Sequence, residues 1–303
     1  MVAVVTQPDR PAGRGQRVVP TPVKAAAEAR GLQVVTPVAL RAFASEALSY
    51  GADAFVVASY GRIVPQVLLD LVPIAFNLHP SLLPLYRGAT PLQSAIRDGR
   101  AETGLTIIAM DAGMDTGDIV LRERAPIGPE ETYGELHDRL ALRAAELLIV
   151  ALERYAAGTL ERTPQSVIAA QDGITPGDIA ATATHPLGKD DLRIDWTAPR
   201  RRVIDGVRAF APQPLARTDF AGAGTLKIAA LRALDARAPA AEPRPVVNGP
   251  FVRDGKSPFF GALCGDGELV AIERVVAPGR PVVSGEDFAR SWFGRALRPA
   301  GAP

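Results

Sequence analysis

Two short stretches of the sequence carry residue types that suit acyl chemistry. In the first, residues 76–88 (FNLHPSLLPLYRG), Asn77 and His79 end an apolar segment and a proline-rich loop follows directly. Because a strand repeats its faces every second residue, we expect Asn77 and His79 to point the same way. The second, residues 110–118 (MDAGMDTGD), follows another apolar segment and contains three aspartates. Polar residues at strand ends are typical of a site on an open α/β sheet.

Asn, His and Asp together could stabilise and move charge in an acyl transfer. The amide of Asn77 can donate to an oxyanion that develops on a tetrahedral carbon. His79 can hold or move a proton near neutral pH, and an aspartate can fix its tautomer and raise its basicity. Spacing alone leaves the question open, because a single Asn or His at a strand end is more often a turn or capping residue.

The three aspartates could instead form a metal loop. The order of Asp111, Asp115 and Asp118 does not fit an EF-hand, and neither a second His nor a Cys is near them in the sequence. We therefore expect no metal.

Several motifs, weak singly but specific together, resemble the folate-dependent formyltransferases. The matching residues are NLH at 77–79, SLLP at 81–84, RG at 87–88, ETG at 102–104 and DTGD at 115–118. Further segments resemble the members of that family that act on tRNA, namely TQPDRPAGRG at 6–15, RIDW at 193–196, VRAF at 207–210 and CGDG at 264–267. The resemblance covers nearly the whole chain.

The resemblance implies a formyl transfer from 10-formyltetrahydrofolate to the free amino group of methionine on initiator tRNA, for initiation of translation. In that reaction Asn77 donates to the oxyanion, and His79 supports the same charge or shuttles a proton. Asp115 orients His79 and helps the amine to lose its proton. The residues expected to line the pocket of the folate donor are Ser81, Leu82, Leu83 and Pro84.

The predicted tRNA contacts are Arg10, Arg14 and Arg17, in a loop rich in glycine and proline. Such a loop is more often simply solvated, but the family uses it to enter the acceptor-stem end of the tRNA. The family has a lysine close after its second arginine, whereas this sequence has Gln16 and Arg17. Residues 200–202 (RRR) open a predicted helix, and they indicate either a solvated helix end or a phosphate contact.

Strands alternate with helices along the first half of the chain, which predicts an α/β sheet. Expected strands are 1–5, 34–35, 54–58, 72–79 and 104–110, and expected helices are 22–30, 42–50, 65–71, 90–98, 132–157 and 200–210. Short alternating segments at 225–231, 246–252, 259–264 and 268–275 predict a small barrel.

With the resemblance, these patterns give a Rossmann-like, doubly wound formyltransferase domain followed by an OB-like β-barrel that binds tRNA. We place the formyltransferase domain at residues 1–170, a linker at 171–198 and the barrel at 199–303.

The composition suits a cytoplasmic enzyme. A chain of 303 residues with 47% hydrophobic content can bury the cores of two domains, and a net charge of +1 names no partner. Its single cysteine, Cys264, excludes an internal disulfide. No apolar run is long enough to span a membrane, and the N-terminus lacks a signal-peptide layout. We expect a monomer.

The start of the sequence departs most from the resemblance. Family members carry a strand and a helix before the segment that residues 1–5 match. The first strand of a doubly wound sheet is usually internal, so its loss would expose two strand edges. We expect either a start codon assigned too late or a truncated chain, and the alternative is a genuinely shortened family member.

Three other functions stay open. A sugar-nucleotide formyltransferase shares the Asn, His and Asp trio, but the Arg10 to Arg14 loop argues against it. A formyltetrahydrofolate hydrolase would release formate without an acceptor. An inactive RNA-binding remnant would bind tRNA without folate, although the intact trio argues against decay.

Overall fold

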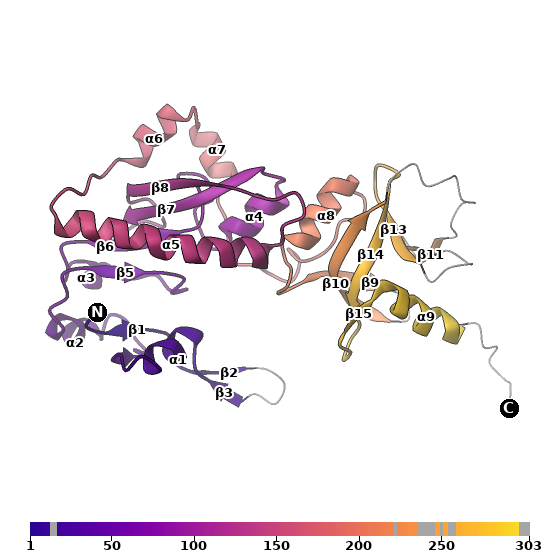
Figure 1. The fold of residues 1–303 in the computed structure, drawn as a ribbon, viewed down its shortest axis with the longest axis horizontal. Coiled ribbons are helices and arrows are strands. Elements are labelled where there is room, and N and C mark those ends of the chain that lie inside the picture. Colours follow the sequence, from indigo (N-terminus) through magenta and orange to yellow (C-terminus); the bar gives the residue numbers. More distant parts are fainter. Residues whose placement is uncertain (13–16, 221–222, 235–245, 249–250, 254–258, 297–303) are drawn as a thin grey trace. The chain divides into compact units, whose positions relative to one another are not determined.

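The computed structural model of the protein describes residues 1–12, 17–220, 223–234, 246–248, 251–253 and 259–296 (Figure 1). The chain forms two compact units, each built from several segments. The first comprises residues 1–89, 104–123 and 143–183, and the second comprises residues 90–103, 124–142 and 184–303. No helix in the described ranges is both long and apolar enough to cross a membrane.

A four-stranded sheet with the order β5-β6-β7-β8 underlies the candidate site. Its strands are β5 (Phe55–Val57), β6 (Ala75–His79), β7 (Glu102–Ala109) and β8 (Asp118–Pro126). β5 is parallel to β6, as the apolar run at 54–58 predicts, whereas β7 runs antiparallel to β6. The sheet is therefore mixed, and the predicted α/β architecture is confirmed.

The long helix α5 (Tyr133–Ala156) matches the predicted helix at 132–157. It packs on β6 through Tyr155, whose ring meets the fully buried ring of Phe76 edge to face at 6.0 Å between centroids. The other predicted helices of the first half are also present, as α1 (Pro22–Glu28), α2 (Ala44–Ser49), α3 (Gln66–Leu69) and α4 (Pro91–Arg97).

Near the N-terminus, β1 (Val4–Val5) pairs in parallel with β4 (Val34–Val35) as a separate two-stranded sheet. Among the described residues β1 pairs only with β4, and β5 pairs only with β6. Each of these strands therefore has an unpaired edge. Both strands pack on the same apolar cluster, because Val5 and Phe55 contact the group around Leu40, Phe43 and Leu68.

The predicted linker contains regular structure that periodicity did not indicate. Helix α6 (Gln165–Gln171) ends at the first residue of the linker, and helix α7 (Pro176–Ala181) lies within the linker. In α7, Thr175 and Asp178 form a capping box, in which each side chain accepts from the backbone N–H of the other. Fewer than two helical turns are too short for an apolar repeat to show, and the assignment of residues 171–198 as a linker stays a prediction.

The second unit is built on a seven-stranded antiparallel sheet with the order β11-β12-β13-β14-β10-β9, on which β15 pairs with β14. Its strands are β9 (Ala216–Phe220), β10 (Gly224–Ala233), β11 (Val246–Asn248), β12 (Phe251–Arg253), β13 (Phe260–Leu263), β14 (Leu269–Val276) and β15 (Val282–Ser284). Helices α8 (Arg200–Arg208) and α9 (Gly285–Ala296) accompany the sheet. The core contains the buried rings of Phe220, Phe251, Phe260 and Phe288. The predicted β-rich C-terminal domain is confirmed, although β9, β15 and α9 were not predicted.

Two short strands, β2 (Arg10–Ala12) and β3 (Arg17–Val19), form an antiparallel hairpin in the segment predicted to be a basic loop.

Candidate active site

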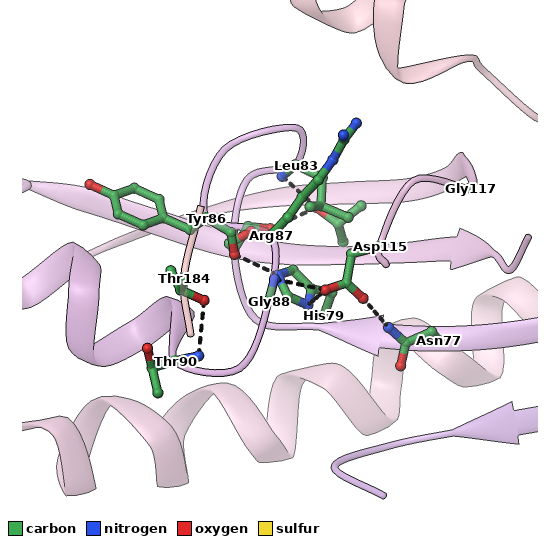
Figure 2. Close-up of polar contacts among 12 residues, drawn as sticks. Asn77, His79, Leu83, Tyr86, Arg87, Gly88, Thr90, Asp115, Gly117 and Thr184 are labelled. Atoms are coloured by element: carbon green, nitrogen blue, oxygen red, sulfur yellow. Dashed lines mark hydrogen bonds and ion pairs between the residues drawn. The ribbon is translucent and has the colours of Figure 1, made fainter. Parts of the chain in front are cut away.

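The carboxylate of Asp115 meets both polar residues of β6 (Figure 2). Asn77 donates through Nδ2 to Oδ1 of Asp115 at 3.1 Å, and Nδ1 of His79 lies 3.5 Å from Oδ2. The alternation of a strand places Asn77 and His79 on one face, as predicted. The three predicted catalytic side chains therefore form one cluster.

Asp115 reaches this cluster in the loop of a hairpin. β7 runs against β6 so that Ala109 pairs with Phe76 near the start of β6, and the loop before β8 then turns back. At Gly117 a side chain would clash, because an added Cβ would lie 1.9 Å from the carbonyl oxygen of Ala109. The second polar stretch thus follows the end of a strand, as predicted, although that strand runs antiparallel to β6.

The backbone of Asp115 has a φ of +54°, in the left-handed region. Asp tolerates this region better than most residues, and such conformations persist where the surroundings hold them. Both carboxylate oxygens of Asp115 are held, because the Gly88 N–H donates to Oδ2 at 2.9 Å while Asn77 donates to Oδ1.

His79 is held by a backbone carbonyl. Its Nε2 lies 2.9 Å from the carbonyl oxygen of Tyr86, which can only accept, so Nε2 carries a proton. Burial lowers the pKa of His79, whereas the carboxylate of Asp115 raises it. The neutral ring therefore has its lone pair on Nδ1, on the side of Asp115. The carbonyl of Tyr86 fixes this tautomer.

This arrangement suits transfer of a proton at Nδ1. When Nδ1 takes a proton, the imidazolium of His79 is stabilised at one nitrogen by Asp115 and at the other by the Tyr86 carbonyl. Nδ2 of Asn77 has two hydrogens, and Asp115 accepts one of them. The second can donate to an oxyanion.

The predicted folate-binding segment is packed inward. Ser81, Leu82, Leu83 and Pro84 are all buried. Ser81 donates from Oγ to the carbonyl of Leu85 at 2.7 Å, and Leu83 packs in a core cluster with Ile108 and Ile119. Their role in folate binding stays a prediction, and it would have to act largely through the backbone of this segment.

The predicted tRNA contacts lie on or beside the β2–β3 hairpin. Arg10 and Arg17 are exposed on the two strands, and Arg10 donates to Oε1 of Gln7 at 2.7 Å. Arg14 lies outside the described residues.

The arginines at the start of α8 have partners within the chain. Arg200 pairs with Glu268 at 2.8 Å, Arg201 pairs with Asp205 at 2.9 Å, and Arg202 donates to the carbonyl of Arg97 at 2.9 Å. Arg201 and Arg202 are nevertheless exposed, so a solvated helix end and a phosphate contact both stay open.

Gln165, the first residue of α6, was missed by sequence reasoning. Its Nε2 donates to the backbone carbonyls of Asp115 and Gly117, each at 2.8 Å, and its Oε1 accepts from Arg87. A glutamine after a proline in a segment without periodicity gives no signal of such a position.

The other two histidines belong to the second unit. His137 is half exposed and pairs with Asp138, and His185 pairs with Asp191. Within the described ranges, no group of three or more His, Cys, Asp and Glu side chains is placed to hold a metal ion.

Known proteins share this fold and much of this sequence. Residues 1–152 match the family described as Formyl transferase, and residues 186–292 match Formyl transferase, C-terminal domain. A methionyl-tRNA formyltransferase of Stutzerimonas stutzeri (strain A1501) is 41% identical over 94% of this chain and 85% of its own length. One of Anaeromyxobacter sp. (strain K) is 42% identical over 95% of this chain and 88% of its own length.

A solved structure resembles the fold at lower identity. It is an N-formyltransferase of Helicobacter canadensis in complex with folinic acid and dTDP-3-aminofucose, with a TM-score of 0.61 and 18% identity, covering 89% of this chain and 88% of that one.

Proposed function

The chain belongs to the methionyl-tRNA formyltransferase family, and we propose that it formylates the methionine carried by initiator tRNA. The donor is 10-formyltetrahydrofolate, and the product serves initiation of translation in the cytoplasm. The observation that carries the proposal is the cluster of Asn77, His79 and Asp115 in a chain 41% identical to a relative of that name.

The reaction forms one C–N bond and breaks another. The amino group of methionine attacks the formyl carbon, and the carbonyl oxygen becomes an oxyanion that accepts from the second N–H of Asn77. His79 takes the proton of the attacking amine at Nδ1, and Asp115 stabilises the imidazolium. The bond from carbon to N10 of the folate then breaks, and N10 receives a proton, which the imidazolium can return. Atoms and charge balance without a redox step.

Two further parts of the chain bind the substrates in this proposal. The backbone of residues 81–84 lines the site of the pterin, beside the loop that holds His79. The exposed guanidinium groups of Arg10 and Arg17, together with Arg14, contact phosphates near the acceptor end of the tRNA.

The test is a formyl-transfer assay with labelled 10-formyltetrahydrofolate and four acceptor conditions. These are methionyl initiator tRNA, the same tRNA uncharged, a nucleotide-linked amino sugar, and no acceptor. An Asp115→Ala protein purified in the same way controls for a contaminating host enzyme.

Label on methionyl-tRNA alone, absent with Asp115→Ala, supports the proposal. Label on the amino sugar instead would make the chain a sugar-nucleotide formyltransferase, and free formate without an acceptor would make it a hydrolase. A folded protein that binds tRNA but neither binds folate nor transfers label would be a non-catalytic remnant.

A further inference from the structure

We infer that Gln165 is a positioning residue for this reaction, which holds the Asp115 loop in place for catalysis from a segment outside both family matches. The part of this inference that is tested by enzyme kinetics rests on the proposed function. Residues 1–152 and 186–292 match the family, and Gln165 lies between them.

Both polar atoms of the Gln165 side chain form hydrogen bonds with residues of the site. Nε2 donates to the carbonyls of Asp115 and Gly117, and Oε1 accepts from Arg87 at 2.6 Å. The side chain is only 5% exposed, so these bonds are shielded from water. One amide thus joins the turn that carries Asp115 to the residue that precedes Gly88.

The Asp115 turn needs such support. Asp115 has a φ of +54°, and its carboxylate must face Asn77, His79 and Gly88 together. The hydrogen bonds from Asn77 and Gly88 fix the carboxylate of Asp115, whereas Gln165 fixes its backbone carbonyl. If the amide were lost, the partly buried carbonyl of Asp115 and the buried carbonyl of Gly117 would lose this donor, and the turn would move to reach water.

The same stretch of chain supports the other partner of His79. After α7, Thr182 accepts through Oγ1 from the backbone N–H of Tyr86 at 3.3 Å, and the carbonyl of Tyr86 is the partner of His79. Residues 165–182 therefore contact both sides of His79 indirectly, through Asp115 and through Tyr86.

The test compares Gln165→Met, Gln165→Glu and Gln171→Met with the parent. Met keeps the volume and removes all four hydrogen bonds, two of which come from Arg87. Glu can still accept from Arg87 but cannot donate to the two carbonyls. Gln171 is exposed at the end of the same helix, so Gln171→Met controls for the chemical change.

In formyl transfer to methionyl-tRNA, we expect both Gln165 variants to lower kcat by ~10- to 100-fold, because a displacement of about 1 Å at a reacting group can cost about 100-fold. The KM values should stay near those of the parent. Added to Asp115→Asn, the Gln165→Met change should cost little more, since both act through one group. If Gln165 had only a structural role, Gln165→Met would lower kcat by the same factor in the parent and in Asp115→Asn. That result would overturn the inference.

A second readout does not depend on the substrate. The groups that face His79 are Asp115, Arg87 and the Tyr86 carbonyl, of which Asp115 raises its pKa and Arg87 lowers it. Displacing Asp115 therefore lowers the pKa of His79. The chain has 3 histidines, so an NMR titration can follow His79 directly.

A lowered pKa of His79 in Gln165→Met, with no change in Gln171→Met, supports the inference even if the parent fails to formylate tRNA. An unchanged His79 titration with parent-like kcat would overturn it. If Gln165→Met does not fold, the kcat of Gln165→Glu gives the test, and a parent-like value would overturn the inference.

Discussion

Nδ1 of His79 lies 3.5 Å from Oδ2 of Asp115, while Nε2 of the same ring donates to the carbonyl of Tyr86 at 2.9 Å. The carboxylate therefore faces a nitrogen without a proton in the neutral ring. Its contribution comes when that nitrogen gains a proton, because the new positive charge then lies beside a buried negative one. The pair is arranged for the charged state that forms during the reaction.

Asp115→Asn should lower the rate of formyl transfer by at least about 100-fold, the lower range for general acid–base catalysis. The amide cannot neutralise the imidazolium. It also has one acceptor oxygen where the carboxylate has two, so it cannot satisfy both Asn77 and Gly88. Single-turnover kinetics measure the effect, and folate binding by the variant is the control. A rate within a few-fold of the parent would exclude a role for the charge of Asp115.

The pH profile of formyl transfer should reflect the lowered pKa of His79. Burial disfavours the imidazolium, so the pKa lies below its ordinary value of 6.5 and the ring is neutral at pH 7. As the pH falls, the rate should hold through 6.5 and then decline at a lower pH, where Nδ1 becomes protonated before the amine arrives. Rates measured from about pH 5 to about pH 8 test this. A decline centred above 6.5 would mean that Asp115 outweighs burial.

In the second unit, Asp205 is fully buried and accepts from Arg208 at 2.6 Å and from Arg201 at 3.0 Å. Arg208, itself 6% exposed, also donates to the carbonyls of Gly128 and Glu131. Through these hydrogen bonds, α8 is held against the loop before α5.

Asp205→Asn should lower the free energy of unfolding by about 3–5 kcal/mol, because it leaves the buried Arg208 without a countercharge. Urea unfolding measures the difference. Glu273→Gln is the matched control, since Glu273 pairs with Arg232 at the surface at 2.6 Å and should contribute far less. Equal losses in the two variants would contradict the role assigned to burial.

The local sequence pattern was sufficient for prediction where a single strand or helix determines the feature. The alternation of β6 correctly placed Asn77 and His79 on one face, and a long amphipathic pattern predicted α5. Asp115 was assigned from the resemblance alone, and the hairpin that carries it depends on β7 running against β6. Strand direction is set by packing over the whole sheet, which no short pattern contains.

Contacts between distant segments could not be predicted. The carbonyl of Tyr86 serves His79 only because the loop after β6 turns back, and any residue type could supply that carbonyl. Arg200 pairs with Glu268 across 68 residues of sequence, and no local pattern indicates that contact. Gln165 fell in a stretch without periodicity, where composition gives no hint of a buried amide.

The most direct test of the account is the rate of formyl transfer by Asn77→Ala, measured with saturating donor and methionyl initiator tRNA. Loss of one oxyanion donor typically costs about 100- to 1000-fold in rate. We expect a loss of that size with folate binding and the thermal unfolding midpoint close to those of the parent. A variant that binds folate and transfers formyl at the parent rate would contradict the proposed role of the Asn77, His79 and Asp115 cluster.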